Sequence, residues 1–229
     1  MKTYYPAERK SIFMADIKTL VQCDFDGTVT EEDVSFMLLD SYARGDWRER
    51  LKEYEAGRIT VGRFNTEAFS MVKADRASLV KAALEGVRIR EGFEEFVAYC
   101  RRKGFRLVII SNGLDFYIKE ILSDIGLDGI EVFAALTSFR PDGGLDVRYI
   151  SPDGRCLDDN FKSSYVSSFL EEGYRVIYVG NGASDFLAAS RSHHVFATGT
   201  LLSHCRERNL DCIPFDDFGE VVRGMESLR

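Results

Sequence analysis

The sequence predicts an α/β fold with a mostly parallel β-sheet, and two observations carry that prediction. Short apolar runs rich in β-branched or aromatic residues alternate with amphipathic helical patterns along most of the chain. One long interval, residues 31–90, holds helical patterns and no convincing strand. Strands that alternate with helices favour a parallel sheet with right-handed crossovers, so the long interval is predicted to be an insertion into it.

Four apolar runs are predicted to be strands buried on both faces. They are Ile17–Cys23, Phe105–Ile110, Arg175–Val179 and His194–Ala197. Helical patterns such as EGFEEFVAYCRRKG and LDFYIKEILSDIG lie between them and end at a glycine, a common helix stop. The stretch around PDGG, residues 141–144, alternates and then turns, which predicts a small β-hairpin. Residues 14–30 and 91–229 are therefore expected to form a Rossmann-like core.

The interval 31–90 is predicted to form a helical cap on this core. Its helices are expected at about residues 31–44, 47–56, 61–73 and 76–85, with Thr30 and Asp33 forming a capping box for the first. Residues 1–13 are expected to be an extension without a chemical role, because Met14 offers an alternative start.

Composition narrows the class of protein. A formal net charge of −7 argues against a nucleic-acid partner, and no apolar run approaches the roughly 20 residues that span a membrane. The N-terminus lacks the apolar core of a signal peptide. The five cysteines are scattered and form no CxxC motif, which is typical of reduced thiols. We therefore predict a cytoplasmic protein with neither nucleic acid nor membrane as a partner.

Polar and charged residues gather where the predicted strands end. Asp24, Asp26, Gly27 and Thr28 follow the first strand, and Ser111, Asn112 and Gly113 follow the second. Asn181, Gly182, Ser184 and Asp185 follow the third, and Lys162 begins a helix just before it. Ligands of open α/β sheets bind outside the carboxyl ends of the strands, so this edge is the predicted active site.

These residue types suit phosphoryl transfer from a phosphate monoester. A carboxylate nucleophile and a dianionic phosphate repel each other, by roughly 4 kcal/mol per unit-charge pair at 4 Å and an effective dielectric of about 20. A magnesium ion bound to the same carboxylate would offset that repulsion. The two neighbouring aspartates thus predict Mg²⁺ as the cofactor and a small phosphorylated metabolite as the substrate.

The roles divide by position. Asp24 ends the strand and is the predicted covalent nucleophile, which would form an aspartyl-phosphate. Asp26 is the predicted general acid and base. The Ser111 hydroxyl and Asn112, helped by nearby N–H groups, are expected to hold phosphate oxygens, and Lys162 would supply a fixed positive charge.

The motifs DFDGTVT, ISNG, Lys162 and GNGASD resemble, in this order, the four motifs of the haloacid dehalogenase superfamily of phosphatases. The helical interval resembles the superfamily's helical cap subclass, which includes phosphoserine phosphatases. The stretches RIREGFEEFVAYC and ISNGLDFYIKEIL are also similar to the methionine-salvage phosphatases of 2-hydroxy-3-keto-5-methylthiopentenyl-1-phosphate.

The resemblance implies a ligand set for Mg²⁺. It consists of Asp24, the main-chain carbonyl of Asp26 and the first polar residue of the last motif. That motif usually reads Gly-Asp and here reads Gly180-Asn181, so the site has one negative charge fewer. The sequence leaves open whether Asn181 or Asp185 supplies the third ligand.

Several further alternatives remain open from the sequence. The same aspartyl-phosphate could pass to another alcohol in a phosphotransferase, or Asn181 could mark a decayed site kept for binding or regulation. A signalling receiver domain fits less well, because it is usually shorter. Asp33 could contact the substrate or simply cap a helix. Four arginines of the cap are candidates for an anionic substrate tail: Arg44, Arg48, Arg58 and Arg63.

Overall fold

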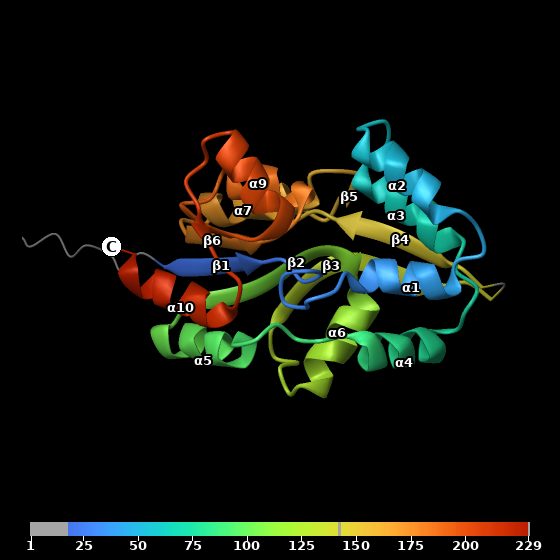
Figure 1. Ribbon diagram of the computed structural model, residues 1–229, viewed down its shortest axis with the longest axis horizontal. Helices are drawn as coiled ribbons and strands as arrows, with labels where there is room; N and C mark the ends of the chain where they lie inside the picture. Colours follow the sequence, from blue (N-terminus) through green and yellow to red (C-terminus); the bar gives the residue numbers. More distant parts are fainter. Residues whose placement is uncertain (1–17, 142, 229) are drawn as a thin grey trace, which may run out of the picture.

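The computed structural model describes residues 18–141 and 143–228. The predictions for residues 1–13 and Met14 lie outside the described residues, as do Ile17 and Asp142. An eight-stranded sheet with the strand order β5-β4-β3-β2-β1-β6-β7-β8 runs through the described part. Helices cover this sheet, so the predicted α/β class is confirmed (Figure 1).

The central strands of the sheet are parallel. The strands are β1 (Thr19–Cys23), β2 (Arg106–Leu114), β3 (Glu131–Phe139), β4 (Leu145–Ile150), β5 (Cys156–Leu157), β6 (Arg175–Gly180), β7 (His194–Ala197) and β8 (Ile213–Pro214). β1 pairs in parallel with β2 on one side and with β6 on the other. β3 turns back on β4 in antiparallel pairing, which is the predicted hairpin, and β3 also pairs in parallel with β2. The hairpin therefore continues the main sheet.

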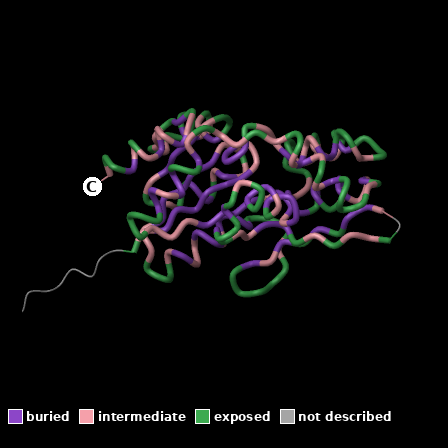
Figure 2. Tube along the Cα trace, turned by 90° about the horizontal axis from the view of Figure 1, so that it is seen from below, coloured by how far each residue is buried: buried purple, intermediate pink, exposed green. Residues whose placement is uncertain are grey.

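Two groups of helices cover the faces of the sheet. The core helices are α5 (Phe93–Lys103), α6 (Asp115–Asp124), α7 (Phe161–Glu171), α8 (Phe186–Ala189), α9 (Gly199–Glu207) and α10 (Phe218–Ser227). Figure 1 shows α5, α6 and α10 on one side of the sheet and α7 and α9 on the other. Residues Leu20–Cys23 of β1 are all buried as a result, and Figure 2 shows the buried residues concentrated in the interior of the molecule. Burial on both faces explains why the buried residues of β1 are apolar except for Gln22.

The helical insert, residues 34–86, follows β1 and its loop. It contains α1 (Val34–Tyr42), α2 (Trp47–Glu55), α3 (Val61–Ser70) and α4 (Arg76–Gly86), close to the predicted ranges. Each helix begins with a side-chain cap, in which Asp33, Asp46, Thr60 and Asp75 accept a hydrogen bond from the third helical N–H.

The predicted capping box at Thr30 does not form. α1 begins at Val34, and Asp33 caps it by accepting from the Phe36 amide at 2.9 Å. The Thr30 hydroxyl is used inside the preceding loop, where it accepts from the Gly27 amide and donates to the Glu32 carbonyl. The same residue type thus stabilises a turn instead of a helix end.

The insert rests on both the sheet and the core helices. Its entry and exit segments lie side by side, because Thr30 and Ile89 form an antiparallel bridge. α3 packs on β4, and α4 packs on α6 (Figure 1). The insert therefore flanks the hairpin extension of the sheet, while the division into a separate cap at residues 31–90 stays a prediction. No helix in the described part of the chain is long and apolar enough to cross a membrane.

Phe218 joins the end of the chain to the core, and truncating it is expected to destabilise the fold. The ring is fully buried and contacts Phe93 and Phe96, with centroids 5.0 and 4.9 Å apart. We predict that Phe218→Ala lowers the free energy of unfolding by about 3–5 kcal/mol, because it leaves a cavity. Urea denaturation would measure the loss.

Leu136→Ala is the control for that measurement. Leu136 is 43% exposed on β3, so its truncation should change the free energy of unfolding by less than about 1 kcal/mol. Similar losses for the two variants would contradict the role given to the aromatic cluster around Phe218.

Candidate active site

The loop after β1 is shaped by its own backbone. The Asp24 amide donates to the Val179 carbonyl at 2.9 Å, so Asp24 still lies at the end of the sheet. The Phe25 carbonyl then accepts from the amides of residues 28, 29 and 30, which closes a tight turn. Gly27 has φ +72°, and a Cβ there would collide with the Asn181 side chain. Glycine is required at this point for both its conformation and its size.

Arg90, which follows the insert in the chain, holds the same loop in place. Its guanidinium donates to the carbonyls of Gly27 and Thr28 at 2.8 Å each, and to the carbonyl of Asp216 at 3.0 Å. One side chain thus ties the β1 loop to the segment before α10. These hydrogen bonds hold the loop in place although it contains a glycine.

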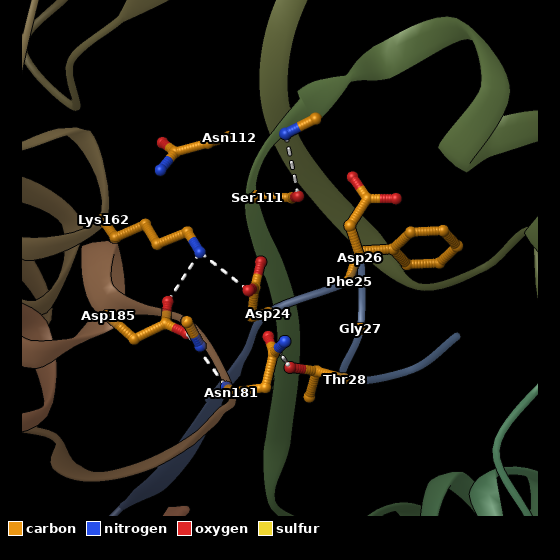
Figure 3. Close-up of polar contacts among 12 residues, drawn as sticks. Asp24, Phe25, Asp26, Gly27, Thr28, Ser111, Asn112, Lys162, Asn181 and Asp185 are labelled. Carbon is orange, nitrogen blue, oxygen red and sulfur yellow. Dashed lines mark hydrogen bonds and ion pairs between the residues drawn. The ribbon is translucent and has the colours of Figure 1, made fainter. Parts of the chain in front are cut away.

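A buried ion cluster joins β1, α7 and the segment after β6. Lys162, on α7, places its Nζ 2.8 Å from Asp24 Oδ2 and 2.6 Å from Asp185 Oδ1 (Figure 3). The side chains of Lys162, Asp24 and Asp185 are 4%, 6% and 0% exposed. Gln22, on β1, donates to the Lys162 carbonyl at 2.9 Å and so holds the start of α7 against the strand.

Asp185 uses all four of its acceptor positions. Oδ1 accepts from Lys162 Nζ and, at 2.7 Å, from the Tyr178 hydroxyl. Oδ2 accepts from the amides of Asn181 at 3.0 Å and Gly182 at 2.8 Å. A carboxylate has about four lone-pair sites, so none is left for a metal ion. Of the two candidates that the sequence left open for the third ligand, these contacts favour Asn181 over Asp185, which positions Lys162 and the backbone after β6.

Burial and charge set the ionisation of the cluster. Burial, together with Asp185, raises the pKa of Asp24 to about 7, although Lys162 opposes the shift. Burial alone would lower the pKa of Lys162, but Asp185 and Asp24 outweigh it and raise that pKa. Lys162 is therefore a permanent cation beside a carboxyl group whose ionisation responds to what binds there.

Asp26 lies two residues further on and is held by other partners. Its Oδ1 accepts from the Val34 amide at 3.1 Å, and its Oδ2 accepts from the Tyr117 hydroxyl. Burial, then the nearby Asp33 carboxylate, raises its pKa well above the ordinary value. A carboxyl group with a raised pKa can keep a proton to give to a leaving group, as a general acid must.

The ISNG segment lies within β2 and not beyond it, because the strand runs on to Leu114. Pairing with β3 is irregular between Ile110 and Leu114, so this stretch is extended but out of register. The Ser111 hydroxyl accepts from the Gly113 amide at 3.0 Å. Oδ1 of Asn112 is buried and has no hydrogen-bond partner among the described residues. A bulge of this kind turns side chains toward a ligand.

Asn65 of the insert binds the backbone of this segment. Its Nδ2 donates to the Asn112 carbonyl at 3.0 Å, and the Tyr149 hydroxyl donates to the same carbonyl at 2.6 Å. Asn65 is buried, so the contact fixes α3 against β2 and β4. The insert is thus directly coupled to the predicted phosphate-binding segment.

A cavity of about 650 Å³ opens over these groups. Its floor contains every predicted site residue except Asp185, namely Asp24, Asp26, Asp33, Ser111, Asn112, Lys162 and Asn181. Its apolar wall comes from the insert and contains Phe36, Leu51, Tyr54, Val61 and Phe64. The site is therefore formed jointly by the carboxyl ends of β1, β2 and β6 and by the insert.

Asp33 has the helix-capping role, one of the two that the sequence left open, while contact with a substrate stays a prediction. It caps α1 and also lines the cavity, and burial raises its pKa to about 6. The four candidate arginines do not line the cavity. Arg48 pairs with Asp40, Arg58 with Glu53 and Arg63 with Glu67, on the outside of the insert. Surface ion pairs account for these three, and Arg44 is exposed.

The oxygen atoms around Asp24 fit a magnesium site. Oδ1 of Asp24 is buried and has no hydrogen-bond partner within the described residues. The Asn181 amide oxygen accepts from the Thr28 hydroxyl at 2.9 Å and keeps a second lone pair. No group of three or more His, Cys, Asp and Glu side chains in the described ranges could hold a metal, so a site would be mixed. One carboxylate, one amide and a main-chain carbonyl suit Mg²⁺, which keeps several waters.

The sequence did not point to Tyr117, Tyr178 and Arg90. Each lies in an ordinary helix, strand or loop pattern and acquires its role only from tertiary contacts. Gln22 offered a signal, because it is the polar residue within an apolar strand. Such a residue must find a partner when it is buried.

The arrangement can support acid–base and nucleophilic chemistry on an anion. It brings together a buried carboxyl group, a permanent cation, a second carboxyl group with a raised pKa and hydrogen-bonding groups on a bulged strand. These elements meet at the carboxyl ends of parallel strands, where ligands of such sheets bind.

Comparison with known proteins places the chain in a family. The sequence profile described as haloacid dehalogenase-like hydrolase matches residues 21–190. A 2-hydroxy-3-keto-5-methylthiopentenyl-1-phosphate phosphatase of Geobacillus thermodenitrificans is 31% identical over 213 residues, which cover 90% of this chain and 94% of that protein. A protein of the same description from Geobacillus kaustophilus is 28% identical, with the same coverage.

Solved structures share the fold. A phosphoserine phosphatase in the form of a phospho-aspartyl intermediate analogue has a TM-score of 0.70 at 21% identity, and covers 91% of this chain and 99% of its own. A substrate-bound phosphoserine phosphatase has a TM-score of 0.69 at 20% identity, with 92% and 99% coverage. The predicted family and its fold are thereby confirmed.

The raised pKa of Asp24 predicts a pH-dependent loss of stability. The folded protein binds the Asp24 proton more tightly than the unfolded chain, so its stability falls as pH rises from about 4 to about 7. Asp24→Asn should remove this fall and raise the free energy of unfolding by on the order of 2 kcal/mol at about pH 8, with little effect near pH 4. Urea denaturation in the presence of a chelator measures both.

Asp211→Asn serves as the matched control, because Asp211 is exposed. It should leave the pH dependence of unfolding unchanged. If Asp24→Asn and wild type differ by the same amount at both pH values, burial does not perturb Asp24 as described.

Proposed function

The chain belongs to the haloacid dehalogenase-like hydrolase family, and from this premise we propose that it is a magnesium-dependent phosphatase of a small phosphorylated metabolite. One observation carries the proposal: Asp24 follows β1 beside the buried Lys162 ammonium, has one oxygen without a hydrogen-bond partner among the residues described, and lines the same cavity as Asp26. Both groups needed for a two-step phosphoryl transfer therefore face one space.

In the first step, Asp24 acts as the nucleophile. A carboxylate oxygen of Asp24 forms a bond to phosphorus while the bond from phosphorus to the ester oxygen breaks. Asp26 gives its proton to the departing oxygen, so the alcohol leaves neutral and Asp26 becomes a carboxylate. Lys162, the Ser111 hydroxyl and nearby N–H groups stabilise the negative charge on the phosphoryl oxygens.

In the second step, Asp26 works as a base. Its carboxylate takes a proton from a water molecule as the water oxygen bonds to phosphorus and the bond to Asp24 breaks. Inorganic phosphate leaves, and both aspartates return to their starting states. Asp26 alternates between the two forms, which its raised pKa allows.

Asp24, the main-chain carbonyl of Asp26 and Asn181 would hold the metal ion. When bound, Mg²⁺ supplies positive charge that offsets the repulsion between Asp24 and the phosphate. Asp185 remains outside this set because its oxygens are occupied. Its contribution is to keep Lys162 in place.

The cavity favours an uncharged, partly apolar leaving group. Among the described residues that line it, the basic side chains are Lys162, already paired twice, and His204. Asp33 and Glu55 add negative charge, and the insert supplies the aromatic wall. A phosphoserine carboxylate would face these acids without a dedicated arginine. A neutral chain that ends in a methylthio group, as in the compound named for the relatives, is better matched.

Phosphate release from purified protein with Mg²⁺ tests this function. We expect turnover of 2-hydroxy-3-keto-5-methylthiopentenyl-1-phosphate with a kcat/KM at least about 10-fold above that for phosphoserine, a difference of about 1.4 kcal/mol. Asp24→Asn should abolish both activities, because the nucleophile is lost.

Two outcomes would contradict the proposal. Turnover by Asp24→Asn at the wild-type rate would exclude the covalent route, and a preference for phosphoserine would exclude the cavity argument. Inorganic phosphate should form without an added alcohol. If phosphate appears only on an added alcohol, the protein is a phosphotransferase.

Asn181 predicts weak metal binding that the substrate strengthens. A neutral amide holds Mg²⁺ less firmly than a carboxylate, but it also repels an incoming phosphate less. Asn181→Asp should tighten Mg²⁺ binding to the free protein by about 10-fold, or about 1.4 kcal/mol. Calorimetric titration, with and without a phosphate analogue, measures the effect; the analogue should tighten binding to the wild-type protein.

Asn209→Asp is the matched control for the added charge. Asn209 is exposed and has a positive φ of 52°, which aspartate tolerates. It should leave Mg²⁺ affinity unchanged. If Asn181→Asp binds Mg²⁺ no better than this control does, Asn181 is not a ligand.

A further inference from the structure

A buried chain of hydrogen bonds links the insert to the Asp26 carboxyl group. Ser35, on α1, lies 2.8 Å from the Tyr117 hydroxyl, measured from Oγ to Oη. Tyr117, on α6, donates in turn to Asp26 Oδ2. The three residues come from the insert, from a core helix and from the β1 loop, so distant parts of the sequence meet at one carboxyl group.

The direction of the chain follows from the number of hydrogens. A phenol has one hydroxyl hydrogen, and in Tyr117 it points to Asp26. Ser35 must then donate to the Tyr117 oxygen. A phenol that accepts a hydrogen bond is a better donor in turn. Ser35 therefore strengthens the hydrogen bond that Tyr117 donates to Asp26.

The contact between Ser35, Tyr117 and Asp26 lies at the edge of the cavity, which Ser35 and Asp26 also line. Tyr117 is fully buried, and Ser35 is 7% exposed. A Cβ at Gly113 would collide with the Tyr117 hydroxyl and with Asp26 Oδ2. Glycine at the end of the ISNG motif is therefore needed to admit the hydrogen bond, a reason separate from phosphate binding.

Two contacts fix both oxygens of Asp26. Val34, at the start of α1, holds Oδ1 through its amide at 3.1 Å, while Tyr117 holds Oδ2. In Figure 3 the Asp26 carboxyl group points away from Lys162, whereas Asp24 points toward it. The two aspartates thus have separate partners, although one residue lies between them in the chain.

We propose that Tyr117, supported by Ser35, is a positioning residue that holds the Asp26 carboxyl group in the orientation needed for proton transfer to the leaving group. The proposal rests on the function proposed above. Tyr117 touches neither substrate nor phosphorus in this role and acts through Asp26 alone.

This role predicts a loss that depends on the leaving group. An alkyl phosphate releases a strongly basic alkoxide and needs protonation by Asp26, while a nitrophenyl phosphate releases a weakly basic anion and needs little. A change that misplaces Asp26 therefore slows the first ester much more than the second. Damage to the fold or to phosphate binding would slow both alike.

The test compares Tyr117→Phe with wild type in the full-length, Mg²⁺-loaded protein. The substrates are an alkyl phosphate that the wild type hydrolyses and 4-nitrophenyl phosphate, and the measure is kcat/KM, which reports the first irreversible step. We expect Tyr117→Phe to lose about 30-fold on the alkyl ester, part of the 10²–10⁴-fold that a general acid contributes, and less than about threefold on the aryl ester. KM for both should stay within about twofold.

Two further variants serve as a weaker perturbation and as a control. Ser35→Ala should lose about threefold on the alkyl ester alone, because the phenol keeps its contact with Asp26 but loses its donor. Tyr165→Phe is the matched control, since the Tyr165 hydroxyl donates to the Ile150 carbonyl at 3.1 Å away from the cavity. It should leave both substrates unaffected.

The outcomes separate this inference from the function on which it rests. If wild type hydrolyses neither ester, the proposed function fails. If wild type is active and Tyr117→Phe slows both esters equally, or neither, Tyr117 does not position Asp26. A faster alkyl reaction in Tyr117→Phe would also overturn the proposal, because Tyr117 would then hold Asp26 away from the leaving group.

Discussion

The contact on which the site depends is the Lys162 ammonium between the carboxyl groups of Asp24 and Asp185. All three groups are almost completely removed from water, and an isolated charge there would cost several kcal/mol. The ion contacts offset this cost only because other donors complete the set. Tyr178 and two backbone amides occupy the rest of Asp185, so the carboxylate cannot turn away from the lysine. The cluster therefore fixes α7, β1 and the segment after β6 relative to each other.

The order of the strands explains why these groups meet. β1 lies between β2 and β6, and the candidate site residues lie at the carboxyl ends of these three strands. The chain leaves the sheet on opposite sides of β1, which opens a crevice at the edge. The insert begins in the loop after β1, so its helices necessarily start beside Asp24. That placement brings Val34 and Ser35 within reach of Asp26 and Tyr117.

Local pattern was sufficient for the central strands of the sheet and for the helices of the insert, but not for the short strands β5 and β8. β7 has the predicted bounds, and the four helices of the insert lie within a few residues of the predicted ranges. The end of β2 was misjudged, because Ser and Gly at 111–113 are typical of a turn, while the structure keeps them in an irregular strand. Capping at Thr30 failed for a related reason: a threonine hydroxyl can serve a helix or a turn, and tertiary context decides.

The sequence grouped the residues that line the cavity better than it identified the residues that hold them in place. Asp24, Asp26, Ser111, Asn112, Lys162 and Asn181 share one cavity, as their positions after the strands suggested. Asp185, one of the two residues that the sequence left open as the third metal ligand, shows what sequence cannot supply. An aspartate four residues after Asn181 has the chemistry of a metal ligand, and only the count of its hydrogen-bond donors assigns it to Lys162. Tyr117 is the converse case, a tyrosine in a helical pattern whose function depends on a partner 91 positions away.

Asn181 illustrates how the loop and the charge of the site constrain each other. Its side chain lies where a Cβ at Gly27 would be. The turn after Asp24 and the segment after β6 are therefore packed directly together. A carboxylate in that place would add a third acid beside Asp24 and Asp185, which share one lysine. The neutral amide keeps the oxygen and avoids that repulsion. The site would then keep enough negative charge to attract a cation, while it would repel an anionic phosphate less than a site with one more carboxylate.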